Sequence, residues 1–550
     1  MTEDALNIPS GTRLECGIVI IGSGAAGMPI ACELQAAGKD VILLESGGLK
    51  TEHETQNLAK GEVCDPSSHG PLDQYRKRIF GGTTTAWGGR CAPFDVIDFE
   101  KRDYVPGSGW PIDRGDLDPF YKRSHDYTLT GDYDYSVSSA LKDGNNATIP
   151  GLGDQTWSQD GLWRFSLPAD FAAEFGDGVR NSDNVRVILH ANALKLCTDP
   201  HGERIESVEA ASLNGNRFTI AAKVVIVAAG GLESTRLLMV SDDVHRKGLG
   251  NEHDQLGRHY LSHISGDLGE VRFQPRDRPV IWQYQMAKDG VYVKRNLRVN
   301  EEIQRREGLL NFRAILTHPP FANAEHGSGV LSSVYLVKRF FRGQIPPEYS
   351  KELAAAGYHH VPQHLRNAVL GLPGLIRFGS HWFLKRTLAR RKYPSVSLKS
   401  RSNSYTIHFD AEQSPDPESR VTLGESRDRF GMRQLVADWR WHDRDVDSIV
   451  RYHRMLRDEI EGSGVGRLSL ENEAVPDVVR EGFAVGSHHI GTTRMADDPR
   501  HGVVDRNAQV HGVEGLFVAA PSVFPTASYA NPVLTITAVA LRLADHVKRL

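Results

Sequence analysis

GIVIIGSGAAG, residues 17–27, is the stretch that decides the fold. Its first five residues, 17–21, form a short apolar run of the kind that makes a buried parallel strand. The alanine-rich stretch 28–37 follows as a predicted helix closed by Gly38, and the apolar run 41–44 predicts a second buried strand. The order of strand, helix and strand predicts a βαβ unit at the start of a parallel sheet.

The turn between the first strand and the helix has the spacing of a dinucleotide-binding motif. Gly22, Gly24 and Gly27 follow the pattern G-x-G-x-x-G, which lets the chain turn tightly and lets the backbone approach a pyrophosphate at the start of the helix. Glu45 ends the second strand, where an acid can hold a ribose hydroxyl. A glycine turn that serves packing alone is the alternative, but strand, helix, second strand and terminal acid all agree with nucleotide binding.

Length and composition limit the class of protein. The 550 residues are enough for two lobes with large cores, and 40% hydrophobic with 24% charged residues is ordinary for a soluble globular protein. A net charge of −4 offers no bulk field for polyanions, so we expect no nucleic-acid partner. The five cysteines are scattered and include no C-x-x-C pair, so we expect neither a disulfide framework nor a zinc site.

The amino-terminal residues 1–15 are polar and lack the charged and then apolar order of a signal peptide. The sequence also contains no uninterrupted apolar run of about 18 residues that would span a bilayer. We therefore expect a cytoplasmic protein.

The stretch 184–229 has the pattern of a small β meander. Strands are expected at 185–189, 193–196, 204–210, 217–220 and 224–229, with a helix over 232–240. Asn214-Gly215 is a strong hairpin turn within this stretch. A meander that returns to a parallel sheet is typical of FAD-binding domains, whereas NAD-binding domains usually continue with helices.

In the stretch 266–480 apolar and polar residues alternate in a mixed pattern, which predicts a separate substrate lobe. Within it, residues 338–392 contain many lysines and arginines but only two acids, Glu348 and Glu352, and they interleave apolar and aromatic residues. This pattern fits a membrane surface or an oligomer contact. A basic, solvated face of a helical insertion is an alternative of at least equal weight.

Two further stretches are candidates for the chemistry. Residues 78–89 pack four glycines and three threonines into a dozen positions, so their backbone can lie against a cofactor where side chains would collide. Surface turns are the alternative, although the embedded Trp87 argues against an idle loop. Near the carboxyl end, residues 516–520 predict the last parallel strand, and Asn531-Pro532 opens an apolar helix that runs to about Leu550.

Together these motifs resemble the glucose-methanol-choline (GMC) oxidoreductases, FAD-dependent enzymes that oxidise alcohols, over nearly the whole chain. Arg78 with Gly81-Gly82 is similar to the first signature of the family, and residues 230–241 partly resemble the second, with departures at Gly231 and Thr235. The resemblance implies an α/β fold (α+β overall), with a Rossmann-like FAD-binding domain built on a parallel sheet and a mixed-sheet substrate-binding domain.

The resemblance also implies a set of cofactor contacts. The residues expected to contact FAD are Gly22, Ser23, Gly24, Ala25, Ala26, Gly27, Glu45, Ser46, Arg78, Gly81, Gly82, Thr83, Thr85, Ala86, Trp87, Gly88, Gly89, Ala193, Ala229, Gly230, Ala520, Asn531 and Pro532. The loop around Trp87 and the stretch 412–417 look closest to the branch of pyranose and glycoside oxidases and bacterial sugar dehydrogenases. Covalently flavinylated members of that branch have a histidine where this chain has Ala86, so we expect FAD to be bound without a covalent link.

The expected division of the chain alternates between the two lobes. We assign residues 1–130, 181–265 and 481–550 to three parts of the FAD-binding domain, the last of which carries the catalytic residues. Residues 131–180 form a connecting, substrate-side segment, and residues 266–480 form the substrate-binding domain.

The resemblance places the active site at His488, in the context His-x-x-Gly-Thr, and at Asn531 before Pro532. Loss of hydride from a carbinol carbon requires that the hydroxyl proton also leave, so a base of near-neutral pKa such as His488 suits the oxygen. Asn531 can orient the hydroxyl, although from the sequence alone a helix cap is the more ordinary role for an asparagine before proline. His489 is the alternative base.

Three other polar residues are also assigned a role. Gln413 can contact a substrate hydroxyl, with a surface turn as the alternative interpretation, and His259 and His263 are expected to be structural.

The leading function is oxidation of a primary or secondary alcohol in a sugar, glycoside or polyol. Oxidation of a lipid-like alcohol such as a terpenoid or sterol, and an FAD-containing lyase, are the alternatives. The electron acceptor stays open between oxygen, a quinone and a redox protein.

Overall fold

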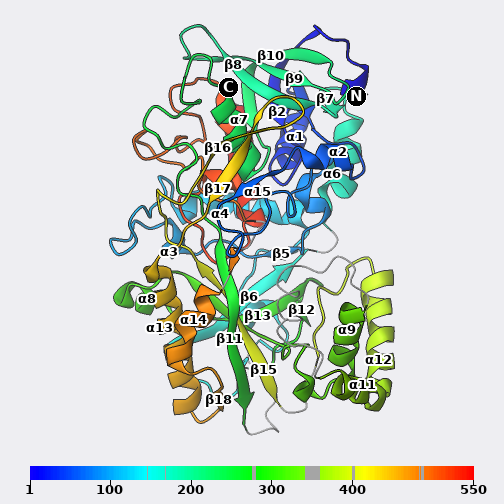
Figure 1. Ribbon diagram of the computed structural model, residues 1–550, viewed down its shortest axis with the longest axis vertical. Coiled ribbons are helices and arrows are strands. Elements are labelled where there is room, and N and C mark those ends of the chain that lie inside the picture. The colour runs from blue at the N-terminus through cyan, green and yellow to red at the C-terminus, as the bar shows by residue number, and fades with distance from the viewer. Residues whose placement is uncertain are drawn as a thin grey trace.

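A mainly parallel sheet forms one lobe of the molecule and an antiparallel sheet forms the other (Figure 1). The computed structural model describes residues 1–144, 147–166, 169–274, 280–340, 360–398, 400, 403–481, 483–484 and 488–550. The chain therefore has the expected α/β class with a Rossmann-like lobe, and every ladder described in the second large sheet is antiparallel. No helix within these ranges is long and apolar enough to cross a membrane.

The nucleotide-binding unit forms as expected. Strand β2 (Arg13–Ile21), helix α1 (Gly27–Ala36) and strand β3 (Val41–Leu44) follow one another, and β2 pairs with β3 in parallel. A Cβ atom at Gly22, whose φ is +100°, would lie 2.6 Å from the carbonyl oxygen of Ala228, and one at Gly27 would lie 1.8 Å from the carbonyl oxygen of Gly22. Any side chain at these two positions would prevent the turn from closing.

The first sheet collects strands from distant parts of the chain. Its order is β1-β7-β3-β2-β10-β9-β8, with β20 on the free side of β10. Its remaining strands are β1 (Thr2–Asp4), β7 (Val185–Leu189), β8 (Asn192–Thr198), β9 (Ile205–Ala211), β10 (Arg217–Val227) and β20 (Leu516–Val518). The two strands expected at 217–220 and 224–229 are one strand, because the residues between them stay paired: Ala221 lies opposite both Ser207 and Glu15.

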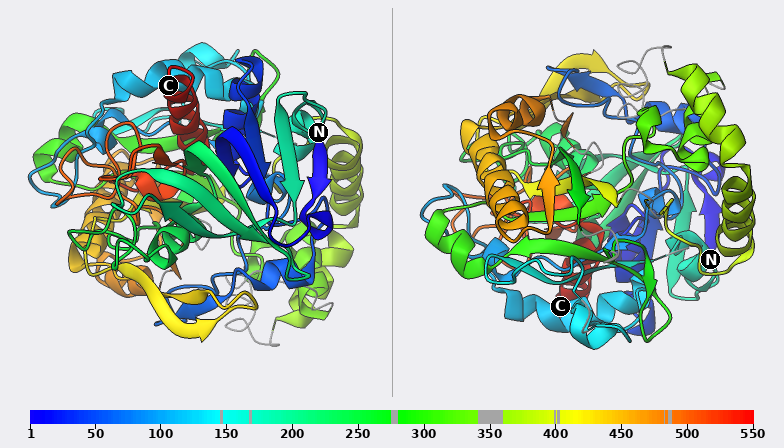
Figure 2. Two further views of the ribbon diagram at one scale, coloured as in Figure 1. Left: turned by 90° about the horizontal axis from the view of Figure 1, so that it is seen from above. Right: turned by 90° about the horizontal axis from the view of Figure 1, so that it is seen from below.

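Helices cover this sheet on both faces. The views along the long axis show α15 (Val533–Val547), the dark red helix, beside the strands of the first sheet (Figure 2). The other helices of this lobe and of the connecting segments are α2 (His53–Asn57), α3 (Val96–Phe99), α4 (Arg114–Thr128), α5 (Val137–Ala140), α6 (Phe171–Arg180) and α7 (Gly231–Val240).

The second large sheet has the order β18-β11-β15-β14-β13-β6-β5, with β12 on β13 and β19 on β11. Its strands are β5 (Arg90–Cys91), β6 (Trp157–Phe165), β11 (His263–Phe273), β12 (Gln285–Met286), β13 (Tyr292–Val299), β14 (Phe312–Thr317), β15 (Ser404–Glu412), β18 (Gly466–Leu468) and β19 (Phe483–Ala484). Most buried apolar residues of this sheet form a core cluster of their own, whereas Trp163, Phe165, Tyr292 and Ile315 belong to the cluster that also includes the first sheet.

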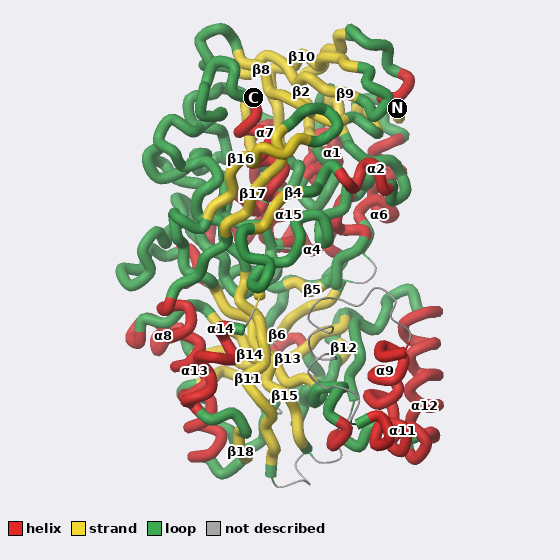
Figure 3. Tube along the Cα trace, viewed as in Figure 1, coloured by secondary structure: helices red, strands yellow, loops and turns green. Residues whose placement is uncertain are grey.

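Two groups of helices flank the second sheet (Figure 3). On one side lie α8 (Glu301–Glu307), α13 (Asp443–Gly462) and α14 (Val475–Arg480). On the other side lie α9 (Gly329–Phe340), α11 (Val361–Leu370) and α12 (Leu372–Trp382), and a π-helix, Phe383–Leu388, continues α12.

A small three-stranded sheet joins segments that are far apart in sequence. Strand β17 (Arg433–Asp438) pairs with β16 (Arg420–Arg427) on one edge and, in parallel, with β4 (Gly61–Val63) on the other. The sheet therefore connects the amino-terminal part of the proposed FAD-binding domain with part of the proposed substrate-binding domain.

Candidate functional site

A cavity of about 460 Å³ lies where the first sheet meets the carboxyl-terminal segment. The expected residues that line it are Gly22, Ser23, Gly24, Ala25, Ala26, Glu45, Ser46, Arg78, Gly82, Thr83, Ala86, Trp87, Gly88, Gly89, Ala193, Ala229, Gly230, His488, Ala520, Asn531 and Pro532. The fold thus gathers the nucleotide-binding turn, the loop 78–89 and the two candidate catalytic residues around one space.

Three expected contact residues lie behind the cavity wall instead. Gly27 packs beneath Gly22, the amide of Gly81 donates to Ser23 Oγ at 2.9 Å, and Thr85 Oγ1 donates to the carbonyl oxygen of Gly82 at 2.9 Å. These residues support the lining loops, Gly27 through close packing and the other two through hydrogen bonds within the protein.

Glu45 lies at the end of β3 and is buried. Its carboxylate accepts hydrogen bonds from the amide and hydroxyl of Ser23, at 3.1 and 2.6 Å, and from the amide of Gly47 at 2.9 Å. Burial raises the pKa of this carboxyl group, and these hydrogen bonds oppose that effect. The side chain is held rigidly at the cavity wall, in the place expected for a ribose contact.

The loop 78–89 presents open backbone to the cavity. A Cβ atom at Gly88 or at Gly230 would meet no heavy atom within 4 Å, so space lies in front of both glycines. Trp87 is anchored by its indole N–H, which donates to the carbonyl oxygen of Ala169 at 2.8 Å. An anchored loop with free space before its glycines is a suitable surface for a flat or extended cofactor.

A buried charged cluster forms another part of the wall. Arg76 and Arg78 each donate to Glu233, at 2.8 and 2.7 Å, and Arg236 donates to Asp428 at 2.8 Å. Burial opposes ionisation of Glu233, but Arg78, Arg236 and Arg76 together lower its pKa to about 2. Three guanidinium groups against two carboxylates leave excess positive charge, and Arg78 Nε is buried without a partner within the described ranges. Both features fit the pyrophosphate of a dinucleotide.

The protonation of His488 follows from its neighbour His263. His263 Nε2 lies 3.0 Å from the carbonyl oxygen of Ala527, which can only accept, so Nε2 carries a proton. Burial lowers the pKa of His263 to about 4, so its Nδ1 is bare. His488 Nδ1 lies 2.9 Å from that atom and must donate to it. Burial, followed by His263 and Arg90, also holds the pKa of His488 well below its usual range, so its Nε2 is unprotonated and can accept a hydrogen bond.

Asn531 lies next to His488 Nε2. Arg90 Nε donates to Asn531 Oδ1, and this bond turns the amide so that Asn531 Nδ2 faces His488 Nε2 at 3.3 Å. The helix α15 is capped by Pro532 without a side-chain hydrogen bond, so the helix-cap interpretation of Asn531 is wrong. A donor and an acceptor 3.3 Å apart match the two needs of an alcohol hydroxyl, which can accept from one and donate to the other.

Arg90 itself is held between the two lobes. Its Nη1 donates to Asp410 of β15 at 2.8 Å, and its guanidinium lies 4.2 Å above the ring centre of Trp163 on β6. Opposite Trp163 in the register is Lys294 on β13, whose ammonium lies between 5 and 6 Å from the ring centres of Trp282 and Tyr284. Burial, with a smaller contribution from Arg90, lowers the pKa of Lys294 to about 7.

His489 also lines the cavity but faces a different set of partners. Its Nδ1 lies 2.7 Å from the hydroxyl of Tyr260, which lies 2.8 Å from His69 Nε2. This chain ends where His69 Nδ1 donates to the carbonyl oxygen of Gly70. Neither Asn531 nor an arginine is hydrogen-bonded to His489 within the described residues, so the arrangement favours His488 as the base.

The two unusual positions of the second signature contact the histidine segment. A Cβ atom at Gly231 would lie 2.2 Å from the carbonyl oxygen of His489, so this position admits only glycine. Thr235 Oγ1 lies 2.7 Å from Thr492 Oγ1. Both departures thus fit the packing of α7 against residues 488–492.

The expected substrate contact at Gln413 has no support in this geometry. Its amide oxygen accepts from Ser262 N and Trp439 Nε1, both at 2.8 Å, and its amide nitrogen donates to the carbonyl oxygen of Arg440 at 2.6 Å. The residue is also fully buried and outside the cavity, so it is not a surface turn residue either.

Sequence reasoning missed two residues of the site. Arg90 directly follows the glycine-rich loop, so its position was a usable signal. No sequence signal indicated His263, because strand pairing in the second lobe brings it to His488 across 225 positions of sequence. No group of three or more potential metal ligands is found within the described ranges.

Comparisons with known proteins agree with this geometry. Models of the GMC oxidoreductase family match residues 172–265 and 415–540, and a model of an FAD-binding domain matches residues 17–67. The chain is similar to a 2-methyl-1,2-propanediol dehydrogenase of Mycolicibacterium austroafricanum, at 23% identity over 97% of this chain and 95% of the relative. It is also similar to a 6'''-hydroxyparomomycin C oxidase of Streptomyces lividus, at 23% identity over 96% and 91%.

Among solved structures, a pyridoxine 4-oxidase described as from Mesorbium loti matches with a TM-score of 0.56. The match covers 97% of this chain and 99% of that chain, at 16% identity. The likeness establishes a common fold over almost the full length of both proteins.

Proposed function

Because this chain belongs to the GMC oxidoreductase family, we propose that it oxidises a primary or secondary alcohol carbon of a sugar, glycoside or polyol to a carbonyl, with FAD. Relatives named for a diol and for an aminoglycoside support small hydroxylated substrates. The basic and aromatic character of residues 338–392 would suit a lipid-like alcohol, but none of the described residues of this segment, 338–340 and 360–392, lines the cavity.

The observation that carries the proposal is the unprotonated His488 Nε2, which accepts a hydrogen bond from Asn531 Nδ2 at 3.3 Å at the wall of the cavity. A substrate hydroxyl that accepts from Asn531 donates its proton toward His488, and the neutral imidazole then removes that proton. Arg90 keeps the amide in the required orientation through its bond to Asn531 Oδ1.

The residues that would hold FAD surround the same cavity. Glu45 would hold the adenosine ribose, the turn 22–26 and the excess positive charge near Arg78 would hold the pyrophosphate, and the loop 82–89 would lie along the isoalloxazine. When bound, FAD supplies the acceptor for the hydride that leaves the carbinol carbon. We also propose that it is held without a covalent link, because Ala86 offers no attachment atom.

Anaerobic addition of candidate alcohols tests the function, since only oxidation of the substrate bleaches the yellow absorbance of the flavin. We expect at least one sugar, glycoside or polyol to bleach it, and failure across a broad alcohol series would refute the proposal. Acid denaturation tests the mode of binding. The yellow colour should pass into the supernatant, and colour retained by the precipitate would reveal a covalent link.

A further inference from the structure

A helical column on the outside of the second lobe, formed by α11, α12 and the π-helix, is unusually apolar. Helix α12 buries none of its residues, although it and the π-helix after it contain many large apolar side chains. Eight such side chains on the column are between 52% and 72% exposed: Leu365, Val369, Leu370, Leu372, Ile376, Phe383, Leu384 and Leu388. Exposed apolar residues at this density mark a contact surface, because isolated ones are the normal case.

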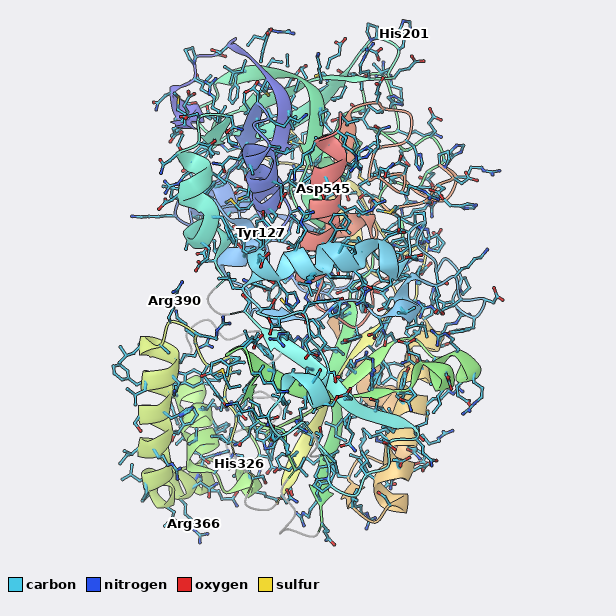
Figure 4. All side chains as sticks on the ribbon, turned by 180° about the vertical axis from the view of Figure 1, so that it is seen from behind. Tyr127, His201, His326, Arg366, Arg390 and Asp545 are labelled. Carbon is cyan, nitrogen blue, oxygen red and sulfur yellow. The ribbon has the colours of Figure 1, made fainter. Side chains whose placement is uncertain are left out.

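The Lys and Arg side chains of the same column face no Asp or Glu within it, so its charge is positive. Residues 360–398 contain seven lysines and arginines and not a single aspartate or glutamate. Arg386 and Arg391 donate to backbone carbonyls of Tyr393 and Leu129. Arg366, Arg377, Lys385 and Arg390 are exposed, and none of these four forms an ion pair with a residue that the structure describes. Figure 4 shows Arg366 and Arg390 at opposite ends of the column.

The segment 338–392 is only partly described. Its residues 341–359, which include Arg342, Glu348, Lys351 and Glu352, lie outside the described ranges. The surface considered below is therefore formed by residues 360–398 alone.

We propose that this face, formed by α11, α12 and the π-helix, docks reversibly on an anionic lipid surface. Apolar side chains can enter the boundary between headgroups and acyl chains while the cations meet the lipid charge. No helix within the described ranges can span a bilayer, so the column would lie along the surface.

A second copy of the chain fits this face less well. A symmetric dimer built on it would place the same face of each copy together, and four cations that lack an ion-pair partner among the described residues would then meet four others. Such an arrangement has no acid within residues 360–398 to neutralise it. A lipid headgroup layer supplies the missing negative charge, and it requires no matching groove.

Vesicle sedimentation of the flavin-loaded full chain tests this inference. The wild type should sediment with vesicles that contain phosphatidylglycerol at low salt, scarcely with pure phosphatidylcholine, and progressively less as salt is added. The fourfold variant R366E/R377E/K385E/R390E should bind at least about a hundredfold more weakly, since each lost cation contributes about 1 kcal/mol. The double variant Ile376→Ser with Phe383→Ser should also bind more weakly.

The matched control K50E/K223E/R246E/K247E changes four exposed cations of the other lobe and should bind like the wild type. All variants should keep their flavin and their elution volume, which separates a lost surface from a lost fold. Absence of wild-type sedimentation at low salt, or equal binding by the R366E/R377E/K385E/R390E variant, overturns the proposal. A dimer of the wild type that the Ile376 and Phe383 changes dissociate, without any vesicle binding, would assign the face to a second copy instead.

Discussion

His263 Nδ1 and His488 Nδ1 lie 2.9 Å apart, and the carbonyl oxygen of Ala527 decides which of the two atoms carries the proton. We therefore propose that His263 is a positioning residue, which would act on the reaction through the tautomer of His488. This role would go beyond the structural role expected from the sequence.

Replacement of His263 tests this relation. In His263→Leu no acceptor holds the Nδ1 proton of His488, so the imidazole can place its proton on Nε2, and anaerobic flavin reduction should slow by roughly 10- to 100-fold. In His263→Asn an amide oxygen can take the place of the Nδ1 acceptor and should restore much of the rate. Equal rates in the two variants at equal flavin content would show that only packing matters at this position.

The two adjacent histidines should differ sharply. His488→Ala should keep the bound flavin and lower its reduction rate by roughly 10²–10⁴, the usual range for a lost general base. His489→Ala should cost much less, because its partners Tyr260 and His69 lead away from Asn531. If flavin reduction slows strongly in the His489 variant and not in the His488 variant, His489 is the base.

The pH dependence of the wild type follows from the environment of His488. Burial, His263 and Arg90 lower the pKa of the imidazole well below 6.5, so the free base is present throughout the neutral range. The rate of flavin reduction should be flat from neutral pH upward and should fall only in acid well below that value. A midpoint at or above 6.5, measured by stopped-flow absorbance, would contradict this assignment.

Asn531→Asp changes the charge beside the base and keeps the acceptor for Arg90. A carboxylate at this position should raise the pKa of His488, because it stabilises the imidazolium, and should move the acid limb of the rate profile to higher pH. The rate above that limb should also fall, since the donor to the substrate hydroxyl is lost. An unshifted limb would place His488 too far from residue 531 for the proposed pairing.

Lys294→Met removes a buried cation. In the folded protein the pKa of this lysine is about 7, against 10.5 for the free group, so the unfolded chain holds the proton more strongly. The loss of stability caused by burial of the charged ammonium is complete below pH 7 and disappears as pH rises toward the pKa of the unfolded chain. At pH 6 the free energy of unfolding of the variant should exceed that of the wild type by roughly 2–4 kcal/mol, so the variant should melt at a higher temperature, and the difference should narrow at pH 9. If the difference in stability does not change with pH, it comes from packing and not from the charge. Lys223→Met, at the surface, is the control.

Local sequence patterns predicted the parts of this site that are built from short stretches. Residues 22–26 of the glycine-rich turn, Glu45 and most of the loop 82–89 line one cavity. Each of these stretches needs only neighbouring residues to take its shape. The position of Asn531 was also predicted, but only through the family pattern, since an asparagine before proline more often caps a helix.

What the sequence could not predict depends on contacts between distant strands. Trp163 lies beneath Arg90, and Asp410 pairs with it, only because β6 and β15 occupy one antiparallel sheet. The burial of Gln413 has the same origin, since Ser262 and Trp439 come to it from other strands and loops. Such pairings have no periodic signal in the chain.

Strand β20 and helix α15 have a consequence for the order in which the protein can be made. A ribosome delivers β2 and β10 long before Leu516–Val518, which completes the first sheet, and Asn531 follows β20. A nascent chain therefore carries an open edge at Val225–Val227 of β10 and an unfinished cofactor site until β20 and Asn531 have emerged. We expect flavin to be captured only after that point, and a chain that stops before Leu516 should leave the ribosome colourless.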